Sequence, residues 1–253
     1  MADRVRWLGH STVLIELDGV RAITDPLLRK QVLHLRRAAP LELDEVAELD
    51  AVLLSHIHYD HLDLPSLRRL DRGVVLVVPR GAGALVSRQG FGSVVELAAG
   101  EEERIGEVTV RAVPAQHGSS RILGTRAEAL GYVVAGSYNI YFAGDTDLFP
   151  GMTELREGLD VALLPIWGWG PSIGPGHLDP RRAAEALALL QPRVAVPIHW
   201  GTYYPLTSAR RTLPGFLTTP AEEFSRAAAE LAPSVEVRVL PVGGELPLTG
   251  SDA

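Results

Sequence analysis

The 253-residue sequence contains no cysteine. Disulfides, thiolate metal ligands and thiol nucleophiles are therefore excluded together. Any metal ion must be held by histidine nitrogen and carboxylate oxygen. The absence of cysteine gives no information about the redox compartment.

The chain also lacks a long apolar segment and a positive net charge. No uninterrupted apolar run approaches the ~18–20 residues of a membrane helix, and the first four residues lack the basic start and apolar core of a signal peptide. The formal net charge of -7 disfavours a nucleic-acid partner. We expect a cytoplasmic protein that acts on a small-molecule substrate without stable membrane insertion. A homo-oligomer is left open.

What the chain does contain is enough apolar material for a core. Hydrophobic residues make up 46% of the sequence and charged residues 22%, a balance typical of globular proteins. The length lies within what one large layered domain can hold. We therefore expect a single domain over residues 1–253.

The order of secondary structure is predicted to alternate between strands and helices. An opening hairpin (residues 5–17 and 20–24) turns at Asp18-Gly19, and residues 27–50 are expected to form a covering loop or short helix. A βαβ rhythm follows, and the second half repeats the hairpin-then-βαβ order. The expected helices cover residues 62–70, 81–89, 179–190 and 219–231, the last opened by a capping box at Thr219, and the expected later strands cover residues 51–54, 74–78, 93–97, 104–113, 131–135, 139–143, 160–165, 193–198 and 235–240.

The densest chemistry lies in residues 55–61, SHIHYDH, directly after an apolar run. Side chains alternate in an extended segment, so His56 and His58 face the same way and can bind one ion. Asp60 and His61 follow where the backbone bends toward a helix. This cluster can serve two neighbouring metal ions.

Three later residues each follow a predicted strand: His117, Asp145 and His199. Layered α/β folds place their sites at strand ends. Taken alone, His117 is an ordinary loop histidine and Asp145 a turn residue. Together with residues 55–61 they make seven nitrogen and oxygen ligands, which satisfies two metal ions: one held by His56, His58 and His117, the other by Asp60, His61 and His199, with Asp145 between them.

Other polar and aromatic residues are candidates for supporting roles. Asp25 either caps a turn or accepts the free N–H of a ligating imidazole. His10, in a predicted strand, is either structural or lines the site. Trp167 and Trp169 belong to a Gly- and Pro-rich segment that is either a packed surface loop or a mobile aromatic lid that forms a substrate wall, and we favour the lid. Arg121 and Arg126, close after His117, could clamp a phosphate or carboxylate of the substrate, although a surface role is the simpler explanation for Arg126. Tyr203 is a further substrate-contact candidate.

At this point the sequence resembles the metallo-β-lactamase superfamily, whose His-x-His-x-Asp-His motif is present as His56 to His61. It is most similar to the branch of ascorbate-phosphate lactonases and N-acylphosphatidylethanolamine-hydrolysing phospholipases D. The resemblance extends over nearly the whole chain, through the motifs WLGHST (7–12), TDP (24–26), QH (116–117), FAGDT (142–146), HLDP (177–180) and HWGT (199–202). It implies a four-layer αββα sandwich with a dinuclear site at one edge of the two sheets and the same seven ligands. Gly118 departs from that branch, which usually has Trp after the second-motif His.

The expected reaction is hydrolysis by a hydroxide that bridges two divalent ions, with Zn the first expectation and Mn or Fe also suitable. The scissile bond would be a phosphodiester, a lactone or an ester. Asp60 would orient the hydroxide. His177, just before a predicted helix, would contact the substrate or protonate the leaving group, unless it simply flanks the helix. The alternative function is a metal-dependent sensor or binding module without turnover.

Overall fold

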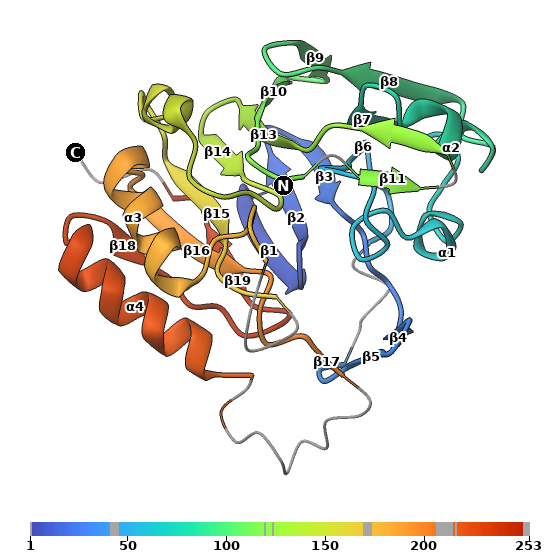
Figure 1. Ribbon diagram of the computed structural model, residues 1–253. Coiled ribbons are helices and arrows are strands. Elements are labelled where there is room, and N and C mark those ends of the chain that lie inside the picture. The colour runs from blue at the N-terminus through green and yellow to red at the C-terminus, as the bar shows by residue number, and fades with distance from the viewer. Residues whose placement is uncertain are drawn as a thin grey trace.

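Two seven-stranded sheets form the centre of the fold (Figure 1). This computed structural model describes residues 2–40, 46–118, 120–122 (backbone only), 124–168, 174–205, 215 and 217–249. The order in the first sheet is β19 (Glu245–Pro247), β1 (Arg4–Gly9), β2 (Thr12–Leu17), β3 (Val20–Thr24), β6 (Ala51–Leu53), β7 (Val75–Pro79), β8 (Ser93–Leu97). The order in the second is β18 (Glu236–Val237), β16 (Val194–Ile198), β15 (Val161–Pro165), β14 (Asn139–Phe142), β13 (Leu130–Ala135), β10 (Val108–Pro114), β9 (Glu102–Ile105).

Each sheet combines antiparallel and parallel strands. In the first, β1, β2 and β3 are antiparallel, and β3, β6, β7 and β8 are parallel. In the second, β9, β10, β13 and β14 are antiparallel, and β14, β15, β16 and β18 are parallel. The predicted hairpin-then-βαβ order of both halves is therefore confirmed.

Helices cover the outer face of each sheet, as Figure 1 shows. The first sheet carries α1 (Leu64–Leu67) and α2 (Gly83–Ser87), and the second carries η2 (Pro150–Leu155), α3 (Pro180–Leu190) and α4 (Thr219–Leu231). Strand alternation explains the layers. Val52 packs outward with the α1 and α2 residues, while its neighbours Ala51 and Leu53 pack into the core between the sheets. The expected αββα sandwich is confirmed.

Two smaller sheets lie outside the sandwich: β4 (Gln31–Val32) and β5 (Leu35–Arg37) pair with β17 (Tyr203–Pro205), and β11 (Ser120–Ile122) pairs with β12 (Thr125–Ala127). The covering loop or short helix predicted for residues 27–50 is thus partly wrong, because residues 31–37 form a hairpin. Its partner strand β17 lies far along the sequence, and Val32, Leu35 and Tyr203 bury one another. A local sequence pattern does not encode such a pairing.

The opening hairpin also differs from prediction. The strand expected over residues 5–17 is two antiparallel strands, β1 and β2, and His10 lies in the turn between them. Gly9 has φ +110° and His10 φ +54°, so the chain reverses there. A Cβ on Gly9 would lie 2.8 Å from Thr202 Cγ2. Close packing against Thr202 therefore requires glycine at this turn.

Helix ends show where local signals were reliable. Asp179 caps α3 by accepting a hydrogen bond from the Arg182 N–H, as predicted. The capping box predicted at Thr219 is wrong, because the cap of α4 is Thr218 and makes no side-chain capping bond. Helices α1 and α2 are shorter than predicted. The strand expected over residues 235–240 is reduced to β18, and β19 was not predicted.

Candidate metal centre

The first group of ligand atoms comprises three imidazoles. His56 and His58 follow β6, and His117 follows β10. His56 Nε2 lies 2.9 Å from His58 Nδ1, which lies 3.1 Å from His117 Nε2. Three ring nitrogens at such distances can bind one ion.

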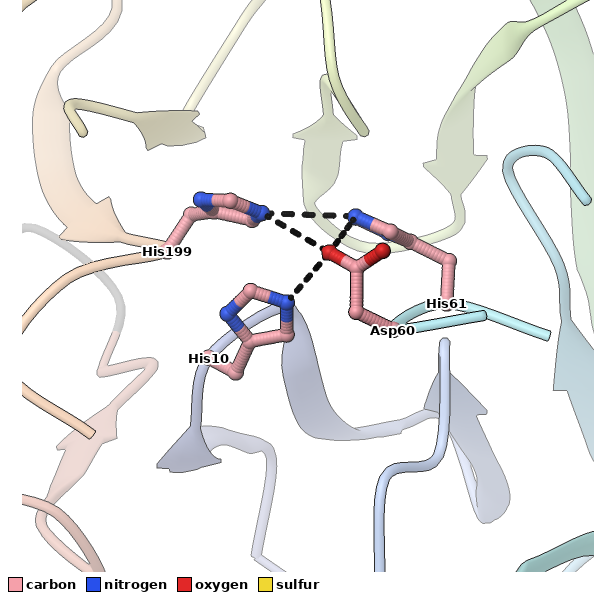
Figure 2. A group of neighbouring side chains, drawn as sticks. All are labelled: His10, Asp60, His61 and His199. Atoms are coloured by element: carbon pink, nitrogen blue, oxygen red, sulfur yellow. Dashed lines mark hydrogen bonds and ion pairs between the residues drawn. The ribbon is translucent and has the colours of Figure 1, made fainter. Parts of the chain in front are cut away.

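The second group, Asp60, His61 and His199, lies beside the first, and Figure 2 shows these three side chains and His10 pointing toward one another. Asp60 Oδ2 is 3.2 Å from His61 Nε2 and 3.7 Å from His199 Nε2. The two imidazole Nε2 atoms are 3.3 Å apart. His199 follows β16 of the second sheet, whereas Asp60 and His61 follow β6 of the first sheet, so both sheets contribute residues to this group.

Asp145 lies between the two groups. It follows β14 after Gly144, whose φ of +60° turns the chain back toward Ser55. Its Oδ2 is 3.3 Å from His61 Nε2 and 4.0 Å from His56 Nε2, and its Oδ1 is 3.3 Å from His199 Nε2. The buried Oδ1 accepts no hydrogen bond from the part of the chain that the structure describes. An oxygen buried in this way fits a divalent ion.

Backbone carbonyls and one carboxylate hold the ligating rings. Asp25, fully buried, accepts a hydrogen bond from His61 Nδ1 at 2.7 Å and from the Ser55 backbone N–H at 2.7 Å. His117 Nδ1 donates to the Gly176 carbonyl at 2.8 Å. His199 Nδ1 donates to the Trp167 carbonyl at 2.6 Å. Each bond leaves Nε2 facing the site, the orientation in which metal-bound histidines are usually held.

The charges at the site favour cation binding. Burial raises the pKa of Asp60 and of Asp145, but His61 near the first, and His199 and His61 near the second, hold both pKa values well below the ordinary value. Burial and the charge of His61 lower the pKa of His56 well below its ordinary value. Ionised carboxylates and neutral imidazoles are the forms that bind metals. Burial lowers the pKa of His61 and His199, but Asp145 and Asp60 outweigh it and raise both pKa values, so a bound ion would replace the protons on these two rings. The nitrogen and oxygen donors fit divalent ions.

His10 extends the second group (Figure 2). Its Nε2 lies 3.1 Å from Asp60 Oδ2, and its ring centroid lies 3.9 Å from that of His199. Burial and the charge of His199 lower the pKa of His10 to about 3. Tyr203, 2% exposed, donates its hydroxyl hydrogen to the Arg29 carbonyl. Because both side chains are buried, we interpret them as supports for the site rather than contacts to a substrate.

The remaining candidates lie at the rim or outside the described residues. His177 is part-exposed, with Nε2 3.6 Å from Asp145 Oδ2 and its ring against that of His117. Trp167 is half-buried against the α3 and α4 layer. Trp169 and the side chain of Arg121 lie outside the described residues.

Sequence reasoning missed the two carbonyl anchors and one ion pair. Arg182 in α3 binds Asp147 Oδ1 with two nitrogens, at 2.7 and 2.6 Å. The Asp147 N–H donates to the Gln116 carbonyl, directly before His117. Backbone carbonyls leave no residue-type signal. The Asp147–Arg182 pair, 35 residues apart in sequence, resembles any surface ion pair.

Comparisons with known proteins identify the family of this chain. Residues 20–200 match the family described as the β-lactamase superfamily domain. An N-acyl-phosphatidylethanolamine-hydrolyzing phospholipase D of Caenorhabditis elegans is 33% identical over 78% of this chain, but the match spans only 63% of that enzyme. A UPF0173 metal-dependent hydrolase of Methanopyrus kandleri is 33% identical over 95% of this chain and 97% of its own. The solved structure of Igni18, a metallo hydrolase from Ignicoccus hospitalis, has a TM-score of 0.73 and 26% identity, and covers 99% of this chain and 100% of its own.

The chain belongs to the β-lactamase superfamily. It has the metallo-β-lactamase fold, with two mixed sheets flanked by helices. Within the described residues, no helix is long and apolar enough to span a membrane.

Proposed function

We propose that this protein is a metal-dependent hydrolase and that it cleaves a phosphodiester, lactone or ester bond in a small anionic substrate, with two divalent ions. Zn suits the nitrogen and oxygen donors, and Mn or Fe also satisfies them. One observation carries the proposal: Asp145 contacts His56 of the first ligand group and His61 and His199 of the second. Ions held by the two groups would therefore be neighbours that share this carboxylate.

The bound ions would supply a water-derived nucleophile near neutral pH and polarise the substrate oxygen. The buried His10 ring contacts Asp60 Oδ2, and the Asp60 side chain remains 19% exposed. We assign to Asp60 the orientation of the attacking water and acceptance of its proton.

His177 faces the site from its rim. Its Nδ1 donates to the Gly174 carbonyl at 3.1 Å, which directs Nε2 toward Asp145. Its side chain is 27% exposed, so a substrate can reach it. We assign to His177 either a contact to the substrate or protonation of the leaving group.

A panel of reporters tests the proposal at equal metal loading: bis-4-nitrophenyl phosphate, a chromogenic lactone and 4-nitrophenyl acetate. We expect turnover of at least one class, lost by more than about 100-fold in His58→Ala, because an incomplete ligand set costs more than an outer hydrogen bond does. His34→Ala is the matched control, since His34 is an exposed histidine outside the site. A metal-loaded protein that turns over no reporter would instead support a metal-dependent sensor or binding module.

A further inference from the structure

A groove begins beside the ligating His117 and follows the same edge of the sandwich. Its first part has a volume of about 330 Å³ beside His117, with Pro114, Ala115 and Leu130 in its lining. A second part of about 400 Å³ is lined by Pro79 and Leu97. Arg126, Glu128 and Leu130 line both parts, so the two lie side by side. We call this feature the lateral groove.

The lateral groove is part of the architecture of both sheets. Pro79 and Leu97 end β7 and β8 of the first sheet, while Pro114 ends β10 and Leu130 begins β13 of the second. The groove therefore follows the seam between the sheets, at the edge where the metal ligands lie. Volumes of 300–1,000 Å³ are typical of small-molecule sites.

Strand β12 and the residues that follow it form one wall. This strand lies against Gly81, where a Cβ would come within 2.6 Å of the Arg126 carbonyl oxygen. Gly81 also has φ +96°, a conformation that favours glycine. The position of Arg126 over the groove is thus set by a close backbone contact.

The two arginines that line the groove differ in their ion pairing. Arg80 is paired with Glu101. Arg126 is exposed and makes no ion pair with any residue that the structure describes. Glu128, also exposed, lies two residues further along and lines the same two parts. A guanidinium without a carboxylate partner, in a groove that begins at a ligating histidine, is suited to an anionic group.

We propose that the lateral groove binds the part of the substrate beyond the scissile bond, and that Arg126 binds a carboxylate or phosphate on that part. The inference rests on the proposed function, since the groove is assigned to the substrate of the same site. Glu128 opposes the anion and limits affinity for multiply charged substrates.

Two esters of equal length test the assignment: 4-nitrophenyl pentanoate, which is neutral, and the mono-4-nitrophenyl ester of glutaric acid, which ends in a carboxylate. The measured quantity is the ratio of kcat/KM for the anionic ester to that for the neutral ester. Arg126→Gln should lower this ratio about 10-fold, because one hydrogen-bonded charge pair is lost. Arg126→Lys should restore most of it, and Glu128→Gln should raise it. An ester ending in a phosphate shows which anion is preferred.

Arg104→Gln is the control, since Arg104 is an exposed arginine paired with Glu107 outside the groove. A ratio that stays within 2-fold of wild type in Arg126→Gln would overturn the proposal. Calorimetric binding of glutarate to the full chain separates this proposal from the hydrolytic one. If no ester is cleaved but glutarate binds and Arg126→Gln weakens it, the hydrolytic assignment fails and the groove assignment stands. If esters are cleaved and glutarate binding does not depend on Arg126, only the groove assignment fails.

Discussion

Substitution of Asp25 perturbs the site without removing a proposed metal ligand. One carboxylate oxygen accepts the Ser55 backbone N–H, and the other accepts the Ser55 hydroxyl at 2.5 Å and His61 Nδ1 at 2.7 Å. Asp25→Asn keeps the shape but replaces one oxygen with an NH2 group. In one orientation of the amide, the NH2 group faces the Ser55 backbone N–H. In the other, it faces His61 Nδ1–H.

The size of the effect follows from this mismatch. A buried donor left without an acceptor costs about 1–3 kcal/mol of folding free energy. Loss of the acceptor for a ligating histidine typically lowers metal affinity by about 10–100-fold, or roughly 1.4–2.7 kcal/mol. Because Asp25 bonds His61 directly and reaches the first-group ring His56 only through the Ser55 hydroxyl, the loss should fall mainly on one of the two binding steps.

Chelator competition titrations, fitted to stepwise binding, measure both affinities. Asp160→Asn is the matched control: Asp160 also accepts a backbone N–H, from Asn139 at 2.8 Å, but lies outside the site. The reasoning is refuted if Asp25→Asn changes neither affinity by more than the control does.

Two further substitutions or conditions probe the same account. Gly176→Ala should weaken metal binding about 10-fold, because Gly176 has φ +85° and a Cβ would lie 3.3 Å from the His117 Cα; unchanged affinity in chelator titrations would contradict this. The metal-free protein should lose stability as pH falls from 6.5 toward 3, because His10 and His56 stay neutral in the fold but take up protons when unfolded. Each histidine changes the free energy of unfolding by up to about 1.4 kcal/mol per pH unit. His10→Gln should therefore reduce the pH dependence of this free energy between pH 6.5 and 3, as measured by urea unfolding. Above pH 6.5 the metal-free protein should instead lose stability as pH rises. The carboxylates around His61 raise its pKa, so the stabilisation that the protonated ring provides is lost as pH rises through the raised pKa. A free energy of unfolding that does not change from pH 4 to 8 would contradict both statements.

Much of the fold could be predicted because its signals are local. Asp18-Gly19 marks the tight turn between β2 and β3, and Asp179-Pro180 marks the start of α3. Apolar alternation identified most strands of both sheets. Strand β17 and its partner β5 could not be predicted, because their pairing depends on a contact across the whole fold.

The ligand residues could be proposed from sequence because strand ends meet at one edge and each ligand type is recognisable. Their supports could not. His10 was expected in a strand, but its turn depends on Gly9 packing against Thr202. The carbonyls of Trp167 and Gly176 act through backbone atoms, which every residue type carries.

The central claim is a centre of two neighbouring ions held by the ligand groups that meet at Asp145. The direct test is metal analysis by mass spectrometry on the folded full chain, prepared without chelator and exchanged into metal-free buffer. The account predicts close to two divalent transition ions per chain, and fewer than two in Asp145→Ala with the fold retained by circular dichroism. A folded wild-type chain that consistently carries no such ion would contradict it.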